Sequence, residues 1–113
     1  MATIETPLEI SCQDVRAKQE QGASFHFIDC READEHAVAR IDGAVLLPMS
    51  ELAERVAELE PYRDQLIVIH CHHGGRSLRV TRWLRQQGYA QTTSMAGGID
   101  EWSQTLDPTV PRY

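Results

Sequence analysis

The sequence has few cysteines and no long apolar run, and both facts limit what the protein can be. Its three cysteines, Cys12, Cys30 and Cys71, are an odd number without a Cys-x-x-Cys pair. This pattern favours free thiols in a reducing, cytoplasmic compartment over a disulfide framework. No apolar run approaches the roughly 18 residues of a membrane span, so we expect no membrane contact. Residues 1–7 lack a basic region followed by an apolar one, so we also expect no secretory signal.

Positive charge is scarce as well. The chain has 11 Lys and Arg against 17 Asp and Glu, for a formal net charge of −6. A general excess of positive charge is therefore absent, and we expect no nucleic-acid partner. The 113 residues are 42% hydrophobic and 25% charged, which is typical of a soluble globular protein with one core. We expect a single domain over residues 1–113, with its core at about 8–105 and an irregular tail at 106–113.

The most informative stretch of the chain is Leu66–Ser77. Its first four residues are apolar and three are β-branched, which predicts a strand buried on both faces. A loop with two glycines follows, and from Ser77 apolar residues at helical spacing predict a helix that stops at Gly88. A strand, a short loop and a helix N-terminus in this order gather N–H groups around an anion. The same field stabilises a thiolate, so we predict that Cys71 is a reactive nucleophile.

The rest of the chain alternates between strand and helix patterns. Strands are expected at 8–10, 25–30, 45–47, 66–69 and 90–95, and helices at 11–21, 32–38, 50–61, 77–88 and from 97 onward. Ser11 and Ser50 are the expected N-caps of the first and third helices, and Pro61 is expected to end the third. This alternation predicts an α/β fold, a three-layer α/β/α sandwich with a central, mainly parallel five-stranded sheet. Its site should lie at the carboxyl edge of a central strand.

Two further cysteines and one pair of charged residues stand close to predicted strands. Cys12 falls in the first turn of a helix with no base nearby, so we interpret it as a buried small residue. Cys30 continues the second strand and is interpreted as an inert core thiol. Asp29 and Arg31 end that strand two residues apart, so their side chains should project to one side and fasten neighbouring loops.

Four motifs occur in order along the chain: Phe27–Glu32, Glu35–Ala44, Cys71–Ser77 and Ala96–Trp102. Together they resemble the single-domain rhodaneses, a family of sulfurtransferases. They are similar to that family's Asp-x-Arg strand end, its glycine-containing turn, its active-site cysteine loop and its Gly-Gly-x-x-x-Trp motif. In the second motif, Arg40 and Asp42 stand where the family has histidine and proline.

The resemblance implies an enzyme, a sulfurtransferase of the thiosulfate type, with Cys71 as the catalytic residue. Cys71 would take the outer sulfur of a small anionic donor such as thiosulfate and pass it from a persulfide to cyanide or a thiol. The residues support this independently, because the loop offers N–H groups and Arg76 can donate two hydrogen bonds to an anion. The candidate substrate-binding residues are His72, His73, Gly74, Gly75, Arg76 and Ser77. We expect no cofactor and no metal.

Two other chemistries could use the same loop. Cysteine phosphatases place an arginine six positions after the cysteine, whereas Arg76 follows Cys71 by five. The shorter loop encloses less space and suits a single sulfur atom better than a phosphate. A zinc or copper site could use Cys71 with the neighbouring His70, His72 and His73. Consecutive residues of a tight loop point in divergent directions, however, and the sequence shows no second cluster of ligands.

A rhodanese-like module that binds a partner or carries a persulfide is a third possibility. The retained cysteine argues against a catalytically quiet module. Arginines recur every third residue at Arg76, Arg79, Arg82 and Arg85, and could form a docking surface for an acidic protein or simply a solvated helix face. His72 and His73 either line the mouth of the loop or take part in substrate binding or proton transfer.

Overall fold

The computed structural model describes residues 6–113, so the expectation about a secretory signal lies mostly outside the described residues. Five strands form one sheet: β1 (Glu9–Ile10), β2 (His26–Asp29), β3 (Val45–Leu46), β4 (Ile67–His70) and β5 (Thr92–Met95). Every neighbouring pair is parallel, in the order β1-β5-β4-β2-β3. The predicted parallel sheet is confirmed, and β4, which precedes the cysteine loop, is its central strand.

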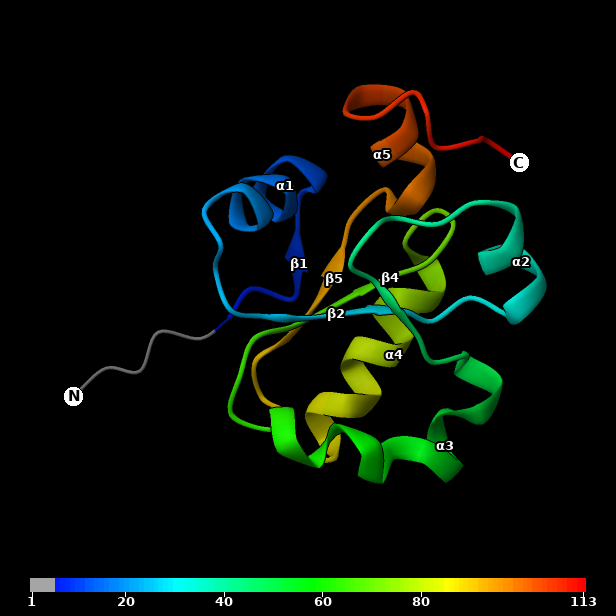
Figure 1. Ribbon diagram of the computed structural model, residues 1–113. Helices are drawn as coiled ribbons and strands as arrows, with labels where there is room; N and C mark the ends of the chain where they lie inside the picture. The colour runs from blue at the N-terminus through cyan, green and yellow to red at the C-terminus, as the bar shows by residue number, and fades with distance from the viewer. Residues whose placement is uncertain (1–5) are drawn as a thin grey trace.

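Helices cover both faces of the sheet, as Figure 1 shows. Their bounds are α1 (Cys12–Glu20), α2 (Ala33–Val38), α3 (Leu52–Arg55), α4 (Gly75–Gln86) and α5 (Gly98–Thr105). In the view of Figure 1, α1 and α5 lie above the sheet and α3 and α4 lie below it. The predicted three-layer α/β/α arrangement is therefore confirmed. Parallel strands need such crossover helices, because a short turn cannot return the chain to the start of the next strand.

Two hydrophobic clusters fill the space between the sheet and its helices. Under α3 and α4, Ile67 and Ile69 of β4 pack with Val80 and Leu84. On the other face, the next residue along β4, Val68, packs with buried residues of α1 and α5. All four residues of β4 are buried. The continuous apolar run in the sequence thus reflects a strand whose alternate side chains enter two different cores.

The segment between β3 and β4 differs from the prediction. The sequence predicts one helix that Ser50 caps and Pro61 ends. The chain instead forms a 3-10 turn at Met49–Glu51, the single turn α3, and a 3-10 helix at Val56–Tyr62 that contains Pro61. Ser50 is not a cap, because its hydroxyl donates to Glu32 Oε1 at 2.6 Å. Short 3-10 turns tolerate proline because the ring clashes mainly with the carbonyl four residues back, which belongs to α-helical geometry.

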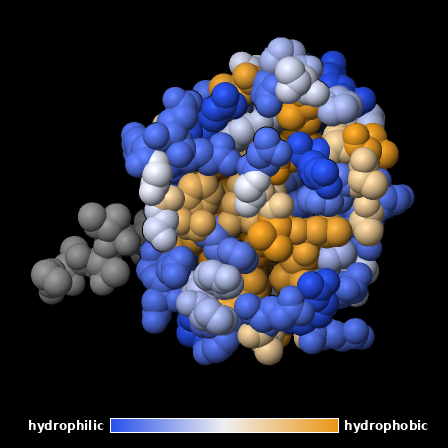
Figure 2. All heavy atoms as spheres, in the orientation of Figure 1, coloured by the Kyte–Doolittle hydropathy of each residue, from blue (hydrophilic) through white to orange (hydrophobic). Residues whose placement is uncertain are grey.

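The surface carries apolar side chains around one edge of the sheet. Figure 2 shows them in the middle of the visible face, over β3 and the strands behind it. β3 is an edge strand of only two residues, and its Val45 is exposed. Among residues 6–113, no helix is both long and apolar enough to cross a membrane.

Candidate active site

Cys71 is the first residue after the central strand β4, at the carboxyl edge of the sheet. The loop that follows turns at Gly74, which has a φ of 107° and is the N-cap of α4. A side chain at Gly74 would face steric strain, since a Cβ there would lie 3.3 Å from the backbone nitrogen of Gly97. Glycine at this position lets the loop curl back, so that its N–H groups face the cysteine.

The sulfur of Cys71 lies among hydrogen-bond donors. The N–H groups of Gly74 and Ser77 donate to Cys71 Sγ at 3.1 and 3.3 Å, and Ser77 Oγ lies 3.4 Å from the sulfur. The Cys30 thiol, then the Ser77 hydroxyl and these two N–H groups, lower the pKa of Cys71 from 9.0 to about 4, against the effect of burial. Cys71 is therefore a thiolate at neutral pH, as a nucleophile requires.

The first turn of α4 leaves two more N–H groups beside the loop. The backbone nitrogens of Gly75 and Arg76 have no hydrogen-bond acceptor among residues 6–113. Such groups at a helix N-terminus carry partial positive charge and attract an anion. The predicted binding residues Gly74, Gly75, Arg76 and Ser77 are thus brought together around Cys71 through their backbone.

The N-terminus of α5 holds the loop from the other side. Ile99 N donates to the carbonyl of Cys71 at 2.9 Å, and Asp100 N donates to the carbonyl of His72 at 3.1 Å. Gly98 allows this approach, because a Cβ there would lie 2.6 Å from the Cys71 carbonyl oxygen. The sequence interprets the two glycines at 97 and 98 as the start of a helix and as part of a family motif, but not as a contact with the cysteine loop. The consecutive pair was the available signal that two backbones meet here.

Ser77 also links the loop to the neighbouring strand. Its Oγ lies 2.7 Å from Ser94 Oγ of β5 and donates toward the Gly74 carbonyl at 3.2 Å. Both serines are fully buried. When Ser94 donates to Ser77 Oγ, the single hydroxyl proton of Ser77 goes either to the Gly74 carbonyl or to the thiolate of Cys71.

Asp29 and Arg31, which the sequence predicts to fasten neighbouring loops, form an ion pair with each other. Both are fully buried, and Asp29 accepts hydrogen bonds from Arg31 Nε at 2.9 Å and from Nη2 at 2.6 Å. His36 Nδ1 lies 2.8 Å from the same carboxylate, and Arg31 Nη2 donates to the Ala39 carbonyl. Burial raises the pKa of Asp29, but Arg31 and its other partners outweigh that effect and lower it. The pair fastens the segment after β2 without contacting Cys71 Sγ.

Arg76 lies near the loop, but a carboxylate occupies its guanidinium. Its Nη1 and Nη2 donate to Glu35 Oε1 and Oε2 at 2.7 and 2.9 Å. Arg76, followed by the hydroxyl of Tyr113, lowers the pKa of Glu35 to about 2. Tyr113 also accepts a hydrogen bond from Arg31 Nη1 at 2.9 Å. The C-terminal tail, which the sequence predicts to be irregular, thus reaches the edge of the site.

His70 at the end of β4 and the loop residues His72 and His73 have different surroundings. His70 is fully buried, and burial lowers its pKa to about 4, so it is neutral. His72 stacks on the ring of Tyr113 at a centroid distance of 4.0 Å. His73 is 67% exposed and lies 3.8 Å from Asp100. Among residues 6–113, no three His, Cys, Asp or Glu side chains converge in a way that could hold a metal ion.

The other two cysteines have different surroundings. Cys12 is buried between α1 and α5, and burial followed by the charge of Glu101 raises its pKa to about 12. Its interpretation as a small buried residue is consistent with this. Cys30 is buried as predicted, but it lies beside Cys71 and affects its ionisation. The sequence gave no sign of that contact, because 40 residues separate the two cysteines.

The predicted basic face of α4 is incomplete. Of the three arginines that could form a docking surface, Arg79 and Arg82 are exposed, while the guanidinium of Arg85 is bound to backbone carbonyls of this chain. Arg85 donates to the carbonyls of Thr92 and Thr6 at 2.8 and 2.7 Å. Three residues turn an α-helix by about 300°, so arginines at this spacing drift by about 60° per step instead of forming one row.

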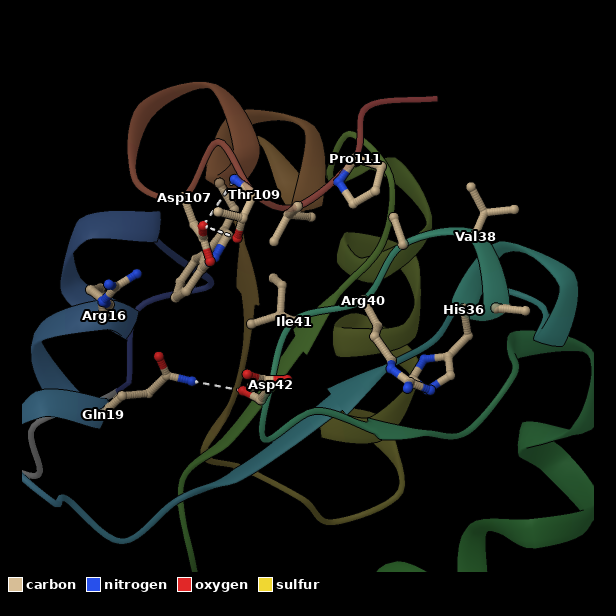
Figure 3. A pocket seen from close by; sticks show the side chains of 14 residues that line it. Arg16, Gln19, His36, Val38, Arg40, Ile41, Asp42, Asp107, Thr109 and Pro111 are labelled. Atoms are coloured by element: carbon tan, nitrogen blue, oxygen red, sulfur yellow. Dashed lines mark hydrogen bonds between the residues drawn. The ribbon is translucent and has the colours of Figure 1, made fainter.

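A polar pocket of about 450 Å³ lies away from the thiolate. Figure 3 shows it between α1, the segment after α2 and the tail, with Arg16, Arg40 and Asp107 around it. Neither Cys71 nor any other residue of its loop lines this pocket. This pocket therefore does not coincide with the hydrogen-bond donors around Cys71.

A protein-family model and several known proteins match most of this chain. A family model described as "Rhodanese-like domain" matches residues 11–105. A sulfurtransferase from Allochromatium vinosum is 31% identical over 102 residues, which cover 90% of this chain and 94% of that protein. Other relatives are much longer. Rhodanese-like/PpiC domain-containing protein 12 of Arabidopsis thaliana is 32% identical over 90 residues, which cover 76% of this chain but 29% of the relative.

Solved structures share the fold. The human single-domain sulfurtransferase TSTD1 superposes with a TM-score of 0.76 at 27% identity, covering 88% of this chain and 97% of the human chain. A rhodanese-related protein from Thermoplasma volcanium reaches 0.79 at 28% identity, covering 95% and 100%. A thiosulfate sulfurtransferase from Pseudomonas aeruginosa gives 0.76 at 27% identity, covering 88% of this chain and 19% of that one.

Proposed function

The chain belongs to the rhodanese-like domain family, and from that membership and the thiolate loop we propose that it is a sulfurtransferase acting through a Cys71 persulfide. Its donor is a small anion of the thiosulfate type, and its acceptor is cyanide or a thiol. The names of the relatives support the reaction class, since the Allochromatium vinosum and human proteins are sulfurtransferases. The Pseudomonas aeruginosa protein, a thiosulfate sulfurtransferase, supports the donor class.

The reaction has two displacement steps at sulfur. The thiolate of Cys71 attacks the outer sulfur of thiosulfate, a bond forms between the two sulfurs, and sulfite leaves with the electron pair of the broken S–S bond. The acceptor then attacks the outer sulfur of the persulfide, and the bond to Cys71 Sγ breaks. Cys71 returns as a thiolate, so it is a nucleophile in the first step and a leaving group in the second. A low pKa keeps Cys71 ionised for the first step and makes it a better leaving group in the second.

The observation that carries the proposal is the pair of N–H groups from Gly74 and Ser77 on Cys71 Sγ. They stabilise negative charge on the sulfur before any substrate arrives. The N–H groups of Gly75 and Arg76, which have no acceptor among residues 6–113, provide donors for a further negative atom. The outer sulfur of a persulfide is such an atom, and a loop of four residues between Cys71 and Arg76 fits its small size.

We propose that the side chains around this loop act on the donor. Arg76 attracts the anion, although it must share its donors with Glu35. His72 and His73 lie at the loop, where the stacked ring of His72 forms a wall and the exposed ring of His73 can meet an approaching anion. Asp29 and Arg31 keep the neighbouring segment in place and take no part in the chemistry.

The test is the intact mass of the reduced protein after incubation with thiosulfate and removal of the excess donor. The protein should gain the mass of one sulfur atom on Cys71, and cyanide should remove that sulfur as thiocyanate. Cys71→Ser should show neither, because serine keeps the size but lacks a low-pKa thiolate. Cys12→Ser is the matched control and should behave as the wild type. Sulfur uptake by folded Cys71→Ser would contradict the assignment.

A further inference from the structure

Cys30 is a second buried thiol next to the proposed nucleophile, and the two steps of sulfur transfer to an acceptor do not involve it. Its N–H donates to the carbonyl of His70 at 3.0 Å, which continues the β2–β4 ladder one residue past the Asp29–His70 pair. Cys30 and Cys71 are therefore opposite each other at the ends of two neighbouring strands. Paired residues of adjacent strands project to the same face, and both cysteines belong to the cluster under α3 and α4.

The spacing of the two cysteines permits a bond between their sulfurs. Neighbouring strands lie about 4.8 Å apart. Disulfides join residues whose Cα atoms are about 4.4–6.8 Å apart, so this spacing falls inside the range. The two thiols also affect each other's ionisation, since Cys30 is the largest influence on the pKa of Cys71. Cys12 has no such neighbour, because it lies in the cluster on the other face of the sheet.

We propose that Cys30 is a resolving thiol, which attacks the Cys71 persulfide, releases hydrosulfide and leaves a Cys30–Cys71 disulfide. This step rests on the proposed function, because it begins from the persulfide. A bond forms between the sulfurs of Cys30 and Cys71, and the bond between Cys71 Sγ and the outer sulfur breaks. The outer sulfur takes the electron pair and the proton of the Cys30 thiol and leaves as HS⁻. The outer sulfur is reduced to sulfide and the thiol of Cys30 is oxidised to the disulfide, so the step needs no other oxidant.

Burial makes this step slow compared with transfer to an acceptor. Cys30 is 1% exposed, and its contact with Cys71, together with burial, raises its pKa. Only a small fraction of Cys30 is ionised, and a thiol attacks through its thiolate. A thiol or cyanide that reaches the outer sulfur therefore takes it first. When no acceptor comes, the persulfide resolves to sulfide, and an external thiol must reduce the disulfide before the next turnover.

The test follows the reduced protein after a thiosulfate pulse, removal of the donor, and incubation without acceptor. In the wild type, the species with one added sulfur should give way to one that is two hydrogen masses lighter than the reduced protein. One sulfide should be released per molecule, and peptide mapping without reductant should show Cys30 linked to Cys71. Cys30→Ser and Cys30→Ala should retain the added sulfur about tenfold longer or more. Cys12→Ser should follow the wild type.

The outcomes separate this inference from the proposed function. If the added sulfur decays equally fast in the wild type and both Cys30 variants, or if the wild type forms no Cys30–Cys71 disulfide, the resolving role is wrong while persulfide chemistry stands. If no protein gains sulfur, the proposed function fails, and the inference with it. Thermal melting checks the fold of each Cys30 variant, and the disulfide in the unmodified protein decides the matter even if both variants unfold.

Discussion

Arg76 and Glu35 form a bidentate ion pair that joins the first turn of α4 to α2 beside the thiolate loop. The guanidinium donates from both terminal nitrogens, in the geometry that an incoming oxyanion would itself use. The carboxylate therefore imitates part of a donor's anionic end and competes with it. Arg76 retains its positive charge in either case, because Glu35 raises its pKa further.

Replacing Arg76 should weaken the binding of an anionic donor. Loss of charge-assisted hydrogen bonds costs about 1.5–3 kcal/mol, so Arg76→Ala should raise the KM for thiosulfate roughly tenfold to a hundredfold. Arg76→Lys should recover only part, since a point charge does not replace the planar fork. Steady-state kinetics at low and high salt measure this, and salt should weaken binding more in the wild type than in Arg76→Ala. Equal efficiency for all three proteins would leave donor recognition to the backbone alone.

Replacing Glu35 should have the opposite effect. Glu35→Gln removes a negative charge next to the loop and releases the donors of Arg76, so the KM for thiosulfate should fall several-fold with little change in kcat. Glu54→Gln, at an exposed position of α3, is the matched control for the change in net charge. A rise in the KM of Glu35→Gln would mean that the carboxylate positions Arg76 for the donor instead of competing with it.

The ionisation of Cys71 should appear in the pH dependence of its alkylation. Its pKa of about 4 predicts that the rate with iodoacetamide stays on a plateau at neutral pH and falls only as the pH approaches 4. Ser77→Ala should move this midpoint upward, because the hydroxyl stabilises the thiolate. Cys71→Ser is the control for background reaction of Cys12 and Cys30, whose pKa values are raised. A midpoint near 8–9, the usual range for a cysteine, would contradict the geometry of the loop.

The same shift links stability to pH. The pKa of Cys71 is lower in the folded chain than its ordinary value of 9.0, so the folded state prefers the thiolate. This stabilisation is fully present above pH 9 and declines as the pH falls toward about 4, where it is lost. The difference in Tm between the wild type and Cys71→Ser should therefore become more favourable to the wild type as the pH rises from 4 to 9. A difference that does not vary with pH would speak against a thiolate at this position.

Local patterns predicted the elements that carry the site, because local chemistry forms them. The β-branched run before Cys71, the glycines of its loop and the cap at Ser11, whose Oγ accepts the N–H of Asp14 at 3.0 Å, all act within a few residues. The prediction that Ser50 is an N-cap is wrong because its hydroxyl donates a hydrogen bond to Glu32, eighteen residues earlier. Neither hydrophobic periodicity nor helix-capping rules predict a contact between residues so far apart in the sequence.

The features that sequence reasoning missed depend on which strands become neighbours. The sequence favours an inert Cys30 because a buried cysteine behaves as a small hydrophobe, yet the β2–β4 register places it beside Cys71. Glu35 reaches Arg76 across 41 positions for a similar reason, since α2 and α4 both begin near the carboxyl edge of the sheet. The predicted parallel sheet identified that edge as the site, but the order of its strands, and so these pairs, had to come from the structure.

Asp29 should matter for stability more than for chemistry. Asp29→Asn leaves Arg31 buried without its counter-charge, which costs on the order of 3–5 kcal/mol. The Tm should fall strongly, while sulfur transfer per folded molecule at low temperature should stay within a few-fold of the wild type. Asp34→Asn, at an exposed position of α2, is the control. An unchanged Tm with lost turnover would instead give Asp29 a role in the reaction.

The length of the loop should separate sulfur transfer from phosphate hydrolysis. One glycine inserted between Gly75 and Arg76 gives the spacing of a cysteine phosphatase, but it also displaces Ser77 by one helical position, about 100°. The N–H and hydroxyl of Ser77 then move away from Cys71 Sγ. Because two hydrogen bonds to a charged sulfur are lost, the rate of sulfur transfer from thiosulfate should fall tenfold or more.

A glycine inserted after Gly22 is the matched control for that insertion, because a Cβ at this exposed turn would contact nothing within 4 Å. It should leave sulfur transfer unchanged. Both insertions and the wild type are assayed with thiosulfate and with an aryl phosphate. The wild type should hydrolyse the phosphate negligibly, since its shorter loop has no room for four oxygens around one centre. Efficient hydrolysis by the wild type would show that loop length does not select the substrate.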